Sequence, residues 1–501
     1  MARGKLYLTP QAWACNNCTV IMASQNPPEK CSGCSGEKFS FMGLEEEETP
    51  MVEVGNTIYE LVFDGNTAQF VHLTEEGKIE YSDFVDYLGK RYCPLVNETV
   101  KKRAVILPKK AIEYESEEKL VEDVRAFVHK YVDVSSDFEL FSAYYVLLSW
   151  VFDILHTVPY LRFIGDFSTG KTRGLDAVGH LCYRPILSNG AVTAAPLYRM
   201  QSVWKGTVII EEADRRKSDH ADEVVKILNC GYERNKPVLR CDVNDPNDIE
   251  THDVFGPKVI SSRSTFSDSA LESRCITEEM KETKRDDIPN ILPSWFYLEQ
   301  EELRGKLLMY RLRNRNKLNV DIIQEMQLGG ADSRIKQAML AFSVLFGNDP
   351  VLWDKFTNFV YGYNLRVVKE RESTLDGQIV HYLIERSEAN LTKEITPSDV
   401  ATTVLNRTDR GGIIGKRLKA LGIRVDYEKN SEGNSIRAIQ WEDASMNSLF
   451  AKYNAKRWLS RNSRAARDTR ASLSGDELGG IDLSTAETGS TANTGGATEQ
   501  L

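Results

Sequence analysis

Apolar residues in the middle of the chain form short runs that alternate with stretches of helical spacing. The runs are Val158–Ile164, Thr207–Ile210 and Pro257–Ser262, and a stretch of helical spacing precedes each of them. Short uninterrupted apolar runs are typical of buried parallel strands. Strands that alternate with helices predict an α/β fold, in which helices cover both faces of a parallel sheet.

The residues before this region have a different pattern. Residues 57–63 and 67–73 flank Asp64–Asn66, which predicts a β-hairpin. Tyr81–Tyr92 is predicted to be a helix, and Glu45–Pro50, which begins with the acidic run Glu45–Glu48, is predicted to be a linker. Because no pattern of chemistry-bearing residues stands out here, we interpret the stretch as a small α/β scaffold.

Helical spacing dominates most of the remaining chain. Glu117–Tyr131 and Asp137–Leu155 are predicted helices, and residues 292–369 are predicted to be helical throughout. Residues 374–441 predict three helices followed by two strands around a turn. After Arg470 the chain is mostly Ser, Thr, Gly and acidic residues, so we predict a disordered tail.

The first apolar run leads into a glycine-rich loop. It matches the phosphate-loop pattern G-x-x-x-x-G-K-T between a strand and a helix, although a purely structural glycine turn is the alternative. In such loops backbone N–H groups surround a phosphate, the lysine reaches the β- and γ-phosphates, and the threonine hydroxyl binds Mg²⁺. We therefore predict an ATP and Mg²⁺ site at Gly165, Asp166, Phe167, Ser168, Thr169, Gly170, Lys171 and Thr172.

An acidic pair follows the second apolar run. Glu211 and Glu212 come directly after Thr207–Ile210, 40 residues beyond Lys171. The carboxyl ends of parallel strands bind ligands, so we predict this pair beside the phosphates, on a neighbouring strand. Glu211 is predicted to hold Mg²⁺, and Glu212 is predicted to polarise the attacking water as general base. Taken alone, such a pair is more often a solvated strand end.

Together the two motifs resemble those of AAA+ ATPases, the ring-forming motors that include clamp loaders, minichromosome-maintenance helicases and viral superfamily III helicases. Glu211 departs from the pattern, because the family normally has Asp there. The resemblance implies a P-loop parallel-sheet core with a helical lid, hydrolysis of ATP with Mg²⁺, and a homo-oligomeric ring. It also extends to the third apolar run, where Phe255–Arg263 resembles the strand that carries sensor 1, a polar residue beside the attacking water. Ser262 is our first choice for that residue, and Ser261 is the second.

Two arginines extend the resemblance. Ala270–Cys275 resembles the segment that carries an arginine finger, so Arg274 of one subunit would neutralise charge on the γ-phosphate of its neighbour. Arg263 is a second candidate for that role. Arg334 is a candidate for the sensor 2 arginine, a nucleotide contact at the start of a lid helix.

Lys236–Phe255 predicts two extended arms around Asn244–Asn247. A hairpin in this region of such helicases often faces the pore of the ring. Lys236, Arg240 and His252 would then touch a nucleic-acid backbone. An ordinary surface hairpin explains the pattern equally well.

Four of the nine cysteines form two CxxC pairs near the start of the chain. Two such turns present four thiolates to one point, which is the shell of a structural Zn²⁺ site, and the unit resembles a zinc ribbon. A redox pair is the alternative. We predict Zn²⁺ at Cys15, Cys18, Cys31 and Cys34, with Pro27–Pro28 suited to a tight ribbon.

The three helices and two strands after residue 373 resemble a winged helix. Thr396–Asp399 has a capping pattern at the start of the second helix, and Gly411–Leu421 would be the recognition helix. Such a helix suits the major groove of DNA, although winged helices also bind proteins. The basic residues that support DNA binding are Arg410, Lys416, Arg417, Lys419 and Arg424, followed by the basic stretch 452–470.

Composition narrows the class of protein. The chain has 501 residues, 41% hydrophobic and 27% charged, and a net charge of −10, which excludes a globally basic DNA coat. Leu140–Phe152 is uncharged over a stretch too short to cross a bilayer, and the start of the chain lacks a secretory pattern. The scattered cysteines indicate a reducing cytoplasm.

We therefore predict a DNA-dependent AAA+ motor, a replicative helicase or helicase-loader of a prokaryote, virus or plasmid, acting on single-stranded or duplex DNA and not on a membrane. The alternatives are a nucleotide-switched DNA-binding initiator or regulator and a protein-remodelling ATPase. The predicted domains are a zinc ribbon (1–45), a small α/β domain (51–115), the ATPase core (116–290), a helical lid (291–372), a winged helix (373–445) and a basic helix with a disordered tail (446–501).

Overall fold

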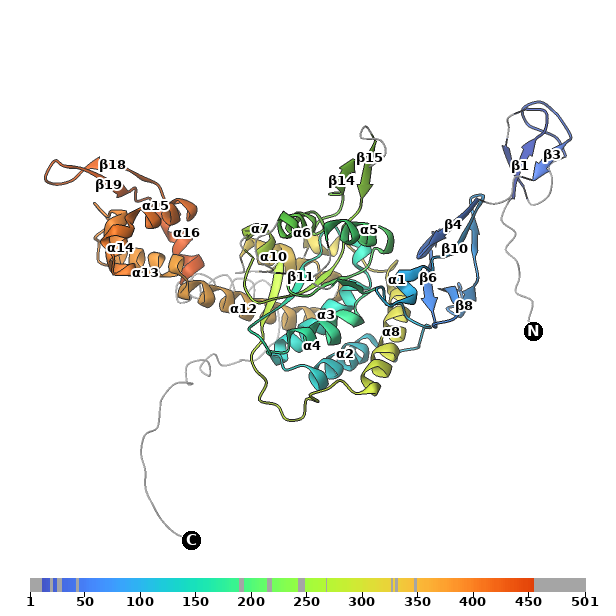
Figure 1. Ribbon diagram of the computed structural model, residues 1–501, viewed down its shortest axis with the longest axis horizontal. Helices are drawn as coiled ribbons and strands as arrows, with labels where there is room; N and C mark the ends of the chain where they lie inside the picture. Colours follow the sequence, from blue (N-terminus) through green and yellow to red (C-terminus); the bar gives the residue numbers. More distant parts are fainter. Residues whose placement is uncertain are drawn as a thin grey trace, which may run out of the picture. The chain divides into compact units, whose positions relative to one another are not determined.

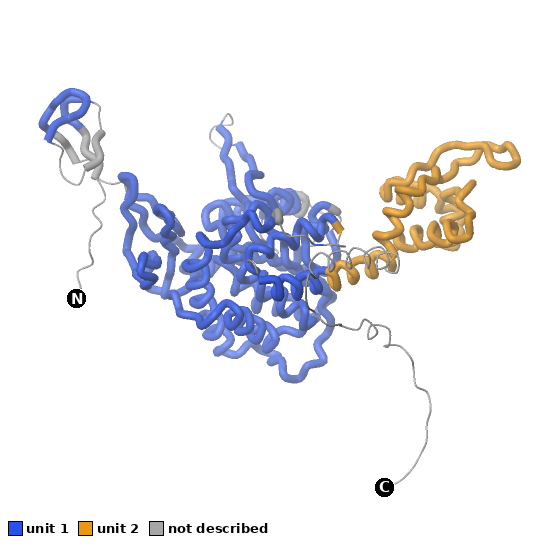
Figure 2. The backbone as a smooth tube through the Cα atoms, turned by 180° about the vertical axis from the view of Figure 1, so that it is seen from behind, with its two compact units in different colours: residues 1–328, 333–360 blue, residues 329–332, 361–501 orange. Residues whose placement is uncertain are grey.

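The computed structural model describes residues 11–18, 21–24, 29–41, 45–188, 193–213, 219–241, 248–266, 268–325, 328, 332–346 and 349–454. The chain divides into two units, which Figure 2 colours separately. The first comprises residues 1–328 and 333–360, and the second comprises residues 329–332 and 361–501. No helix within the described ranges is long and apolar enough to cross a membrane.

A five-stranded parallel sheet forms the centre of the first unit (Figure 1). In spatial order its strands are β12 (Ile186–Ser188), β13 (Val208–Ile210), β16 (Lys258–Ser262), β11 (Tyr160–Ile164) and β17 (Cys275–Glu279). All neighbouring strands pair in parallel. The predicted α/β class and its three predicted strands are confirmed, whereas the apolar pattern did not indicate β12 or β17.

Helices cover both faces of this sheet (Figure 1). Side chains alternate along β11, so Tyr160 and Arg162 point to one face, where they bond to Leu228 and Glu272. Phe163 points to the other face and packs against α3 and α4. The helices on the Phe163 face are α2 (Glu117–Tyr131), α3 (Ser136–Ser149) and α4 (Lys171–Val178); those opposite are α5 (Ala194–Trp204), α6 (Asp219–Cys230) and α7 (Ser269–Glu272).

Residues 45–94 form two small sheets. One has the order β5-β6-β7-β8 (Met51–Val54, Thr57–Phe63, Ala68–Leu73, Ile79–Ser82), and the other has the order β4-β10-β9 (Glu45–Thr49, Lys90–Pro94, Val85–Tyr87). The predicted hairpin is confirmed, with the N–H groups of Asn66 and Thr67 donating to Asp64.

Two expectations for this region are wrong. The helix predicted over Tyr81–Tyr92 is replaced by strands, because Leu88 and Gly89 have φ angles of 50° and 78° and turn the chain between β9 and β10. The predicted linker at Glu45–Pro50 contains strand β4, which pairs in parallel with β10 and places Glu47 3.2 Å from Lys90.

These small sheets share a hydrophobic core with the parallel sheet. Val52, Leu61 and Phe70 belong to the same buried cluster as Tyr160 and Ile186. Helix α1 (Glu98–Lys101) and the 3-10 helices η1 (Phe152–Ile154) and η2 (Gly179–Leu181) lie along the connections.

A buried network of charges reinforces that junction. Glu60 of β6 is 1% exposed, and its two carboxylate oxygens accept from Arg311 at 2.6 Å and Arg184 at 2.7 Å. Arg311 also donates to both oxygens of Asp153 at 2.8 Å, and its charge holds the pKa of that buried carboxyl well below the usual range. Every charge in the network therefore has an opposite partner.

Helices complete the first unit and lead out of it, as the helical spacing predicts. They are α8 (Ser294–Asn314), α9 (Ile322–Glu325), α10 (Ser333–Leu340), α11 (Ser343–Phe346) and α12 (Pro350–Ser373). Phe296 of α8 is fully buried against Phe127 and Tyr131 of α2, which fixes α8 beside the core.

The second unit contains α13 (Leu375–Glu388), α14 (Pro397–Leu405), η3 (Thr408–Arg410), α15 (Gly411–Ala420), β18 (Val425–Lys429), β19 (Ser435–Ile439) and α16 (Asp443–Tyr453). This confirms the predicted order of three helices and two strands. The predicted capping pattern is also present, because Thr396 and Asp399 bond reciprocally at the start of α14. The basic stretch beyond residue 454 and the tail lie outside the described residues.

Candidate functional site

A cleft of about 700 Å³ lies at the carboxyl ends of β11, β13 and β16. Ligands of parallel sheets bind at this edge, because the loops that follow the strands converge there. The residues that line the cleft are Phe167, Ser168, Thr169, Gly170, Lys171, Thr172, Arg173, Asp176, Glu211, Glu212, Ser261, Arg263, Asn290, Ile291, Leu292 and Tyr297.

The glycine-rich loop after β11 has the geometry that its glycines allow. Gly170 has a φ angle of 87° and is the N-cap residue of helix α4. A Cβ atom on Gly165 would lie 2.6 Å from the carbonyl oxygen of Met280, so no larger residue fits. The side chains of Lys171 and Thr169 both donate to the carbonyl of Asp166, so the loop is held by hydrogen bonds to its own backbone.

The acidic pair meets this loop. The hydroxyl of Thr172 donates to Glu211 at 2.7 Å, which joins the first turn of α4 to the end of β13. The expectation that the pair lies on the strand next to the loop is wrong, because β16 lies between β11 and β13. The hydroxyl–carboxylate pair is a suitable set of oxygen donors for Mg²⁺.

Glu212 lies next to Glu211 in a left-handed backbone conformation, with a φ angle of 53°. Its N–H donates to the hydroxyl of Ser261 at 3.2 Å, and its carboxylate accepts from Arg263 at 2.9 Å. Arg263 also lies over the ring of Phe167, 3.9 Å from its centre. A non-glycine residue held with positive φ at a cleft marks a position that its surroundings impose.

The structure separates the two serines proposed for sensor 1. Ser261 pairs in register with Phe163, on the sheet face covered by α4, and it lines the cleft. Ser262 pairs with Ile164 and points to the opposite face, where its hydroxyl is buried without a hydrogen-bond partner among the described residues. The geometry therefore favours Ser261, the second choice, over Ser262.

Asp176 adds a third carboxyl to the cleft, one helical turn beyond Thr172. Burial, and then the charge of Glu211, raise the pKa of Asp176 to about 6. A cation bound between these groups would relieve that repulsion.

Arg274 lies at the amino-terminal ends of the strands, opposite the end that carries the cleft. It precedes β17, and its carbonyl accepts from the N–H of Tyr160, the first residue of β11. Four strand residues, roughly 13 Å at 3.3 Å per residue, separate that point from the end of β11. Its guanidinium donates to Asn229 and lies 5.1 Å from the centre of the Tyr232 ring. Arg274 therefore does not reach the cleft of its own chain.

Neither of the other two arginines has its expected place. Arg334 does not line the cleft; it lies near Tyr232, where the charges of Arg274 and Arg334 oppose the rise that burial causes in the pKa of Tyr232. Arg263, the second arginine-finger candidate, lines its own chain's cleft and bonds to Glu212. It is thus positioned to act within one subunit.

Motif reasoning missed one wall of the cleft. Arg173, Asp176, Asn290–Leu292 and Tyr297 line it, and four of these six residues lie more than 100 positions beyond the phosphate loop. Arg173 holds this wall, because it donates to the carbonyls of Pro289 at 2.9 Å and Asn290 at 3.0 Å. Only the position of Arg173 next to the loop threonine gave a signal.

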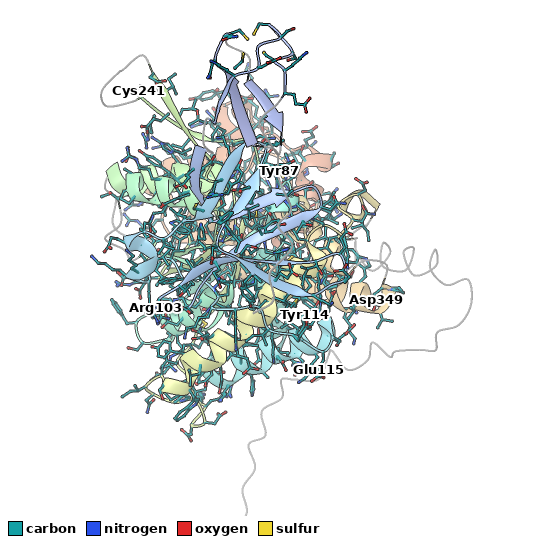
Figure 3. The ribbon with its side chains drawn as sticks, turned by 90° about the vertical axis from the view of Figure 1, so that its right-hand side faces the viewer. Tyr87, Arg103, Tyr114, Glu115, Cys241 and Asp349 are labelled. Atoms are coloured by element: carbon teal, nitrogen blue, oxygen red, sulfur yellow. The ribbon has the colours of Figure 1, made fainter. Side chains whose placement is uncertain are left out.

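The predicted hairpin arms form β14 (Val238–Cys241) and β15 (Ile249–His252), and Figure 3 labels Cys241 beside its tip. The turn predicted at Asn244–Asn247 lies outside the described residues. The predicted contact residues are engaged within the protein: Lys236 pairs with Glu233, Arg240 lies 3.9 Å from Glu223, and His252 bonds to Glu250. Their side chains favour the ordinary surface hairpin.

The four N-terminal cysteines converge on one point. Their sulfur atoms all lie within 4.8 Å of one another, with Cys15 and Cys34, and Cys18 and Cys31, 3.5 Å apart. Four thiolates at 2.3 Å from a tetrahedral Zn²⁺ would be roughly 3.8 Å apart, so the set fits this ion. The N–H of Gly33 donates to Cys31 and lowers the pKa of that thiol to about 7.

The cysteines are held by a three-stranded antiparallel sheet of β1 (Gln11–Cys15), β2 (Ile21–Ser24) and β3 (Phe39–Phe41). Pro27–Pro28 lies outside the described residues.

In the second unit, α15 exposes three cations. Lys416 and Lys419 are exposed, and Arg417 lies 3.6 Å from Asp376. Arg424, just before β18, is 83% exposed and 3.3 Å from Asp426. This helix therefore presents positive charge next to a two-stranded wing.

Comparisons with known proteins add the following. No family model and no curated protein matches the chain. It is similar to the solved structure of the NrS-1 C-terminal region, at 13% identity over 77% of this chain and 97% of that chain, with a TM-score of 0.35. It is also similar to JCV helicase, at 14% identity over 50% of this chain and 67% of that chain, with a TM-score of 0.24. A mutant of Thermotoga maritima RuvB is similar at 13% identity over 64% of this chain and 97% of that chain, with a TM-score of 0.22. Likenesses of this strength carry no argument about activity.

Proposed function

We propose that the chain is an ATP-hydrolysing motor of the AAA+ type that acts on DNA. One observation carries this proposal: the hydroxyl of Thr172 and the carboxylate of Glu211 lie 2.7 Å apart at the mouth of a cleft lined by Lys171 and Glu212. The two motifs are 40 positions apart in the sequence and come from strands that do not pair. A structural turn and a solvated strand end would have no reason to meet.

The chemistry follows from these positions. Backbone N–H groups of the loop and the start of α4 bind phosphate, and Lys171 leaves the Asp166 carbonyl for the β- and γ-phosphates. Thr172 and Glu211 would hold Mg²⁺, whose charge offsets that of the phosphates. Glu212 orients and deprotonates the attacking water. Ser261 holds the backbone N–H of Glu212, and Arg263 holds the Glu212 carboxylate.

The ring is supported by Arg274. A transition state with charge on the γ-phosphate needs a further cation. Arg274 lies at the amino-terminal ends of the strands, away from the cleft of its own chain. Arg274 of one subunit therefore completes the cleft of the next. We propose the same face for Arg334, because its charge opposes the rise that burial causes in the pKa of Tyr232.

DNA is the proposed substrate because of the second unit. The exposed Lys416 and Lys419 of α15 and the wing at β18–β19 suit a duplex backbone and groove. With the four-cysteine unit, proposed to be a structural zinc ribbon, this places two candidate nucleic-acid modules on one ATPase. A replicative helicase or helicase-loader fits that combination best.

The first test is ATP turnover with and without DNA. Lys171→Ala should reduce turnover by about a thousandfold, because it removes the cation that binds the transferred phosphate. Single-stranded DNA should stimulate the native protein. Full turnover by Lys171→Ala would refute the site, and turnover indifferent to DNA would refute the substrate.

The second test distinguishes action within one subunit from action between subunits. Lys171→Ala and Arg274→Ala should each lack turnover when pure. A mixture of the two should regain activity, because an intact cleft then meets an intact Arg274 from a neighbour. A mixture as inactive as its components would refute the shared site.

Metal analysis tests the ribbon. One Zn²⁺ per chain is expected, and Cys31→Ser should release it while ATP turnover in the absence of DNA persists. Absence of bound zinc in the purified protein would refute the site.

A further inference from the structure

The cleft has an end that the phosphate chemistry does not use. Asn290, Ile291, Leu292 and Tyr297 line it. The first three precede α8 and Tyr297 lies in its first turn, so none belongs to a phosphate-binding element. Ile291 is 85% exposed and Tyr297 is 49% exposed. Large apolar side chains gathered at the wall of a polar cleft indicate a ligand surface.

This wall is built rigidly. Gln300 of α8 donates to the carbonyl of Asp176 in α4 at 2.6 Å, and Phe296 is fully buried. The ring of Tyr297 packs edge-on against Phe296, with centres 5.2 Å apart and planes at 86°. Tyr297 is thus held at the cleft before any ligand arrives, which reduces the entropy lost on binding.

Arg173 ties the wall to the phosphate loop. It follows Thr172 directly, and its guanidinium donates to the carbonyls of Pro289 and Asn290. One residue of α4 therefore connects the group that would hold Mg²⁺ with the backbone of the apolar segment. This connection fixes the spacing between the phosphate end and the apolar end of the cleft.

Given the proposed function, we propose that Ile291, Leu292 and Tyr297 bind the base of the nucleotide, with Arg173 as the positioning residue that sets the wall. A flat aromatic ligand joined to phosphates matches a phenol ring and aliphatic side chains beside a phosphate loop. Stacking and apolar contact recognise the face of a base rather than its edge. The site therefore accepts purine triphosphates generally, and GTP binds within about tenfold of ATP.

The test compares a ligand that has a base with one that lacks it. Binding of Mg·ATP and of Mg·tripolyphosphate to the full chain is measured by calorimetry for the native protein and for Tyr297→Ala. The variant should bind ATP about tenfold more weakly and tripolyphosphate as before, because only the stacking contact is lost. Tyr297→Phe keeps the aromatic ring and should bind ATP as tightly as the native protein does.

Leu298→Ala is the matched control. Leu298 is the next residue of the same helix, is 66% exposed and does not line the cleft, so its variant should bind both ligands normally. If Tyr297→Ala disturbs folding, Ile291→Ala on the exposed loop replaces it. Its affinity for ATP should fall about threefold and its affinity for tripolyphosphate should not change, because only a smaller aliphatic contact with the base is lost.

The outcomes are distinct. Unchanged ATP affinity in Tyr297→Ala and Ile291→Ala, or equal weakening of both ligands, would overturn the base wall. A preference for ATP over GTP above about tenfold would also overturn it. Native protein that binds neither ligand, or binds tripolyphosphate equally after Lys171→Ala, would instead refute the proposed function.

Discussion

Two arginine–glutamate pairs in the first unit have similar lengths and opposite surroundings. Arg311 and Glu60 are 2.6 Å apart, with side chains 0% and 2% exposed. Arg263 and Glu212 are 2.9 Å apart, with side chains 41% and 39% exposed. The first pair joins a small antiparallel sheet to helix α8, and the second lines the nucleotide cleft.

The difference shows what each pair can do. A buried ion pair requires every charge to be partnered, and Glu60 also accepts from Arg184 and Tyr183. Such a pair is shielded from water and held by several partners at once, so it remains fixed. An exposed pair is screened by water and contributes little, so Glu212 can exchange Arg263 for a water molecule at small cost.

Breaking the buried pair should have the largest effect. Arg311→Met keeps the stem of the side chain but leaves Glu60 and Asp153 without their shared cation. We expect the free energy of unfolding to fall by about 3–5 kcal/mol, measured by urea denaturation. Arg313→Met is the control, since Arg313 is 33% exposed in its pair with Glu113 and should change stability by less than about 1 kcal/mol. Equal losses would contradict the assigned role of burial.

Asp176 lies between the two extremes, half-buried in the cleft. Its raised pKa, about 6 against an ordinary 3.8, means that the folded state holds its proton after the unfolded chain has released it. Stability is therefore lost as pH rises from about 4 to about 6. Asp176→Asn should remove that loss.

We expect the Asn variant to be more stable than the native protein by about 1 kcal/mol at pH 7.5, after allowance for solvent screening. The gain should vanish near pH 3, where the aspartate is mostly neutral in both states. Thermal unfolding without nucleotide or Mg²⁺ at several pH values measures it, and a gain independent of pH would exclude the titration of Asp176 as its cause.

Breaking the exposed pair should have the smallest effect on stability. Arg263→Gln should change the free energy of unfolding by less than about 0.5 kcal/mol. ATP turnover should nevertheless fall several-fold, because Glu212 loses the cation that orients its carboxylate. Calorimetry and a turnover assay on the same sample would check both, and a stability loss as large as that of Arg311→Met would show that this pair is structural.

Three strands of the parallel sheet and the two motifs that follow them were predictable, because local patterns determine them. A strand, a glycine loop and a helix follow one another between Val158 and Val178, and the strand before Glu211 is apolar at every position. Such elements need no knowledge of distant residues. The order of helices and strands between residues 374 and 441 was predictable for the same reason.

The remaining features depend on contacts between distant residues. Residues 81–92 have helix-like apolar spacing, but pairing of β10 with β4 and β9 decides their structure. The choice between Ser261 and Ser262 depends on which face of β16 meets α4. The wall at Asn290–Leu292 lies at the cleft because Arg173 holds its carbonyls, and no local pattern encodes that bond.

The buried carboxylate of Glu60 also constrains how the chain is made. Its partner Arg311 lies 251 positions later in the sequence. At about 5–20 residues per second, a ribosome needs roughly 13–50 s to synthesise that interval. During this time the apolar residues that share the core with these sheets, which end at Cys275, are already made, but Glu60 still lacks Arg311. Their final folding therefore follows the emergence of helix α8, and a nascent chain stalled before residue 311 should leave them sensitive to protease.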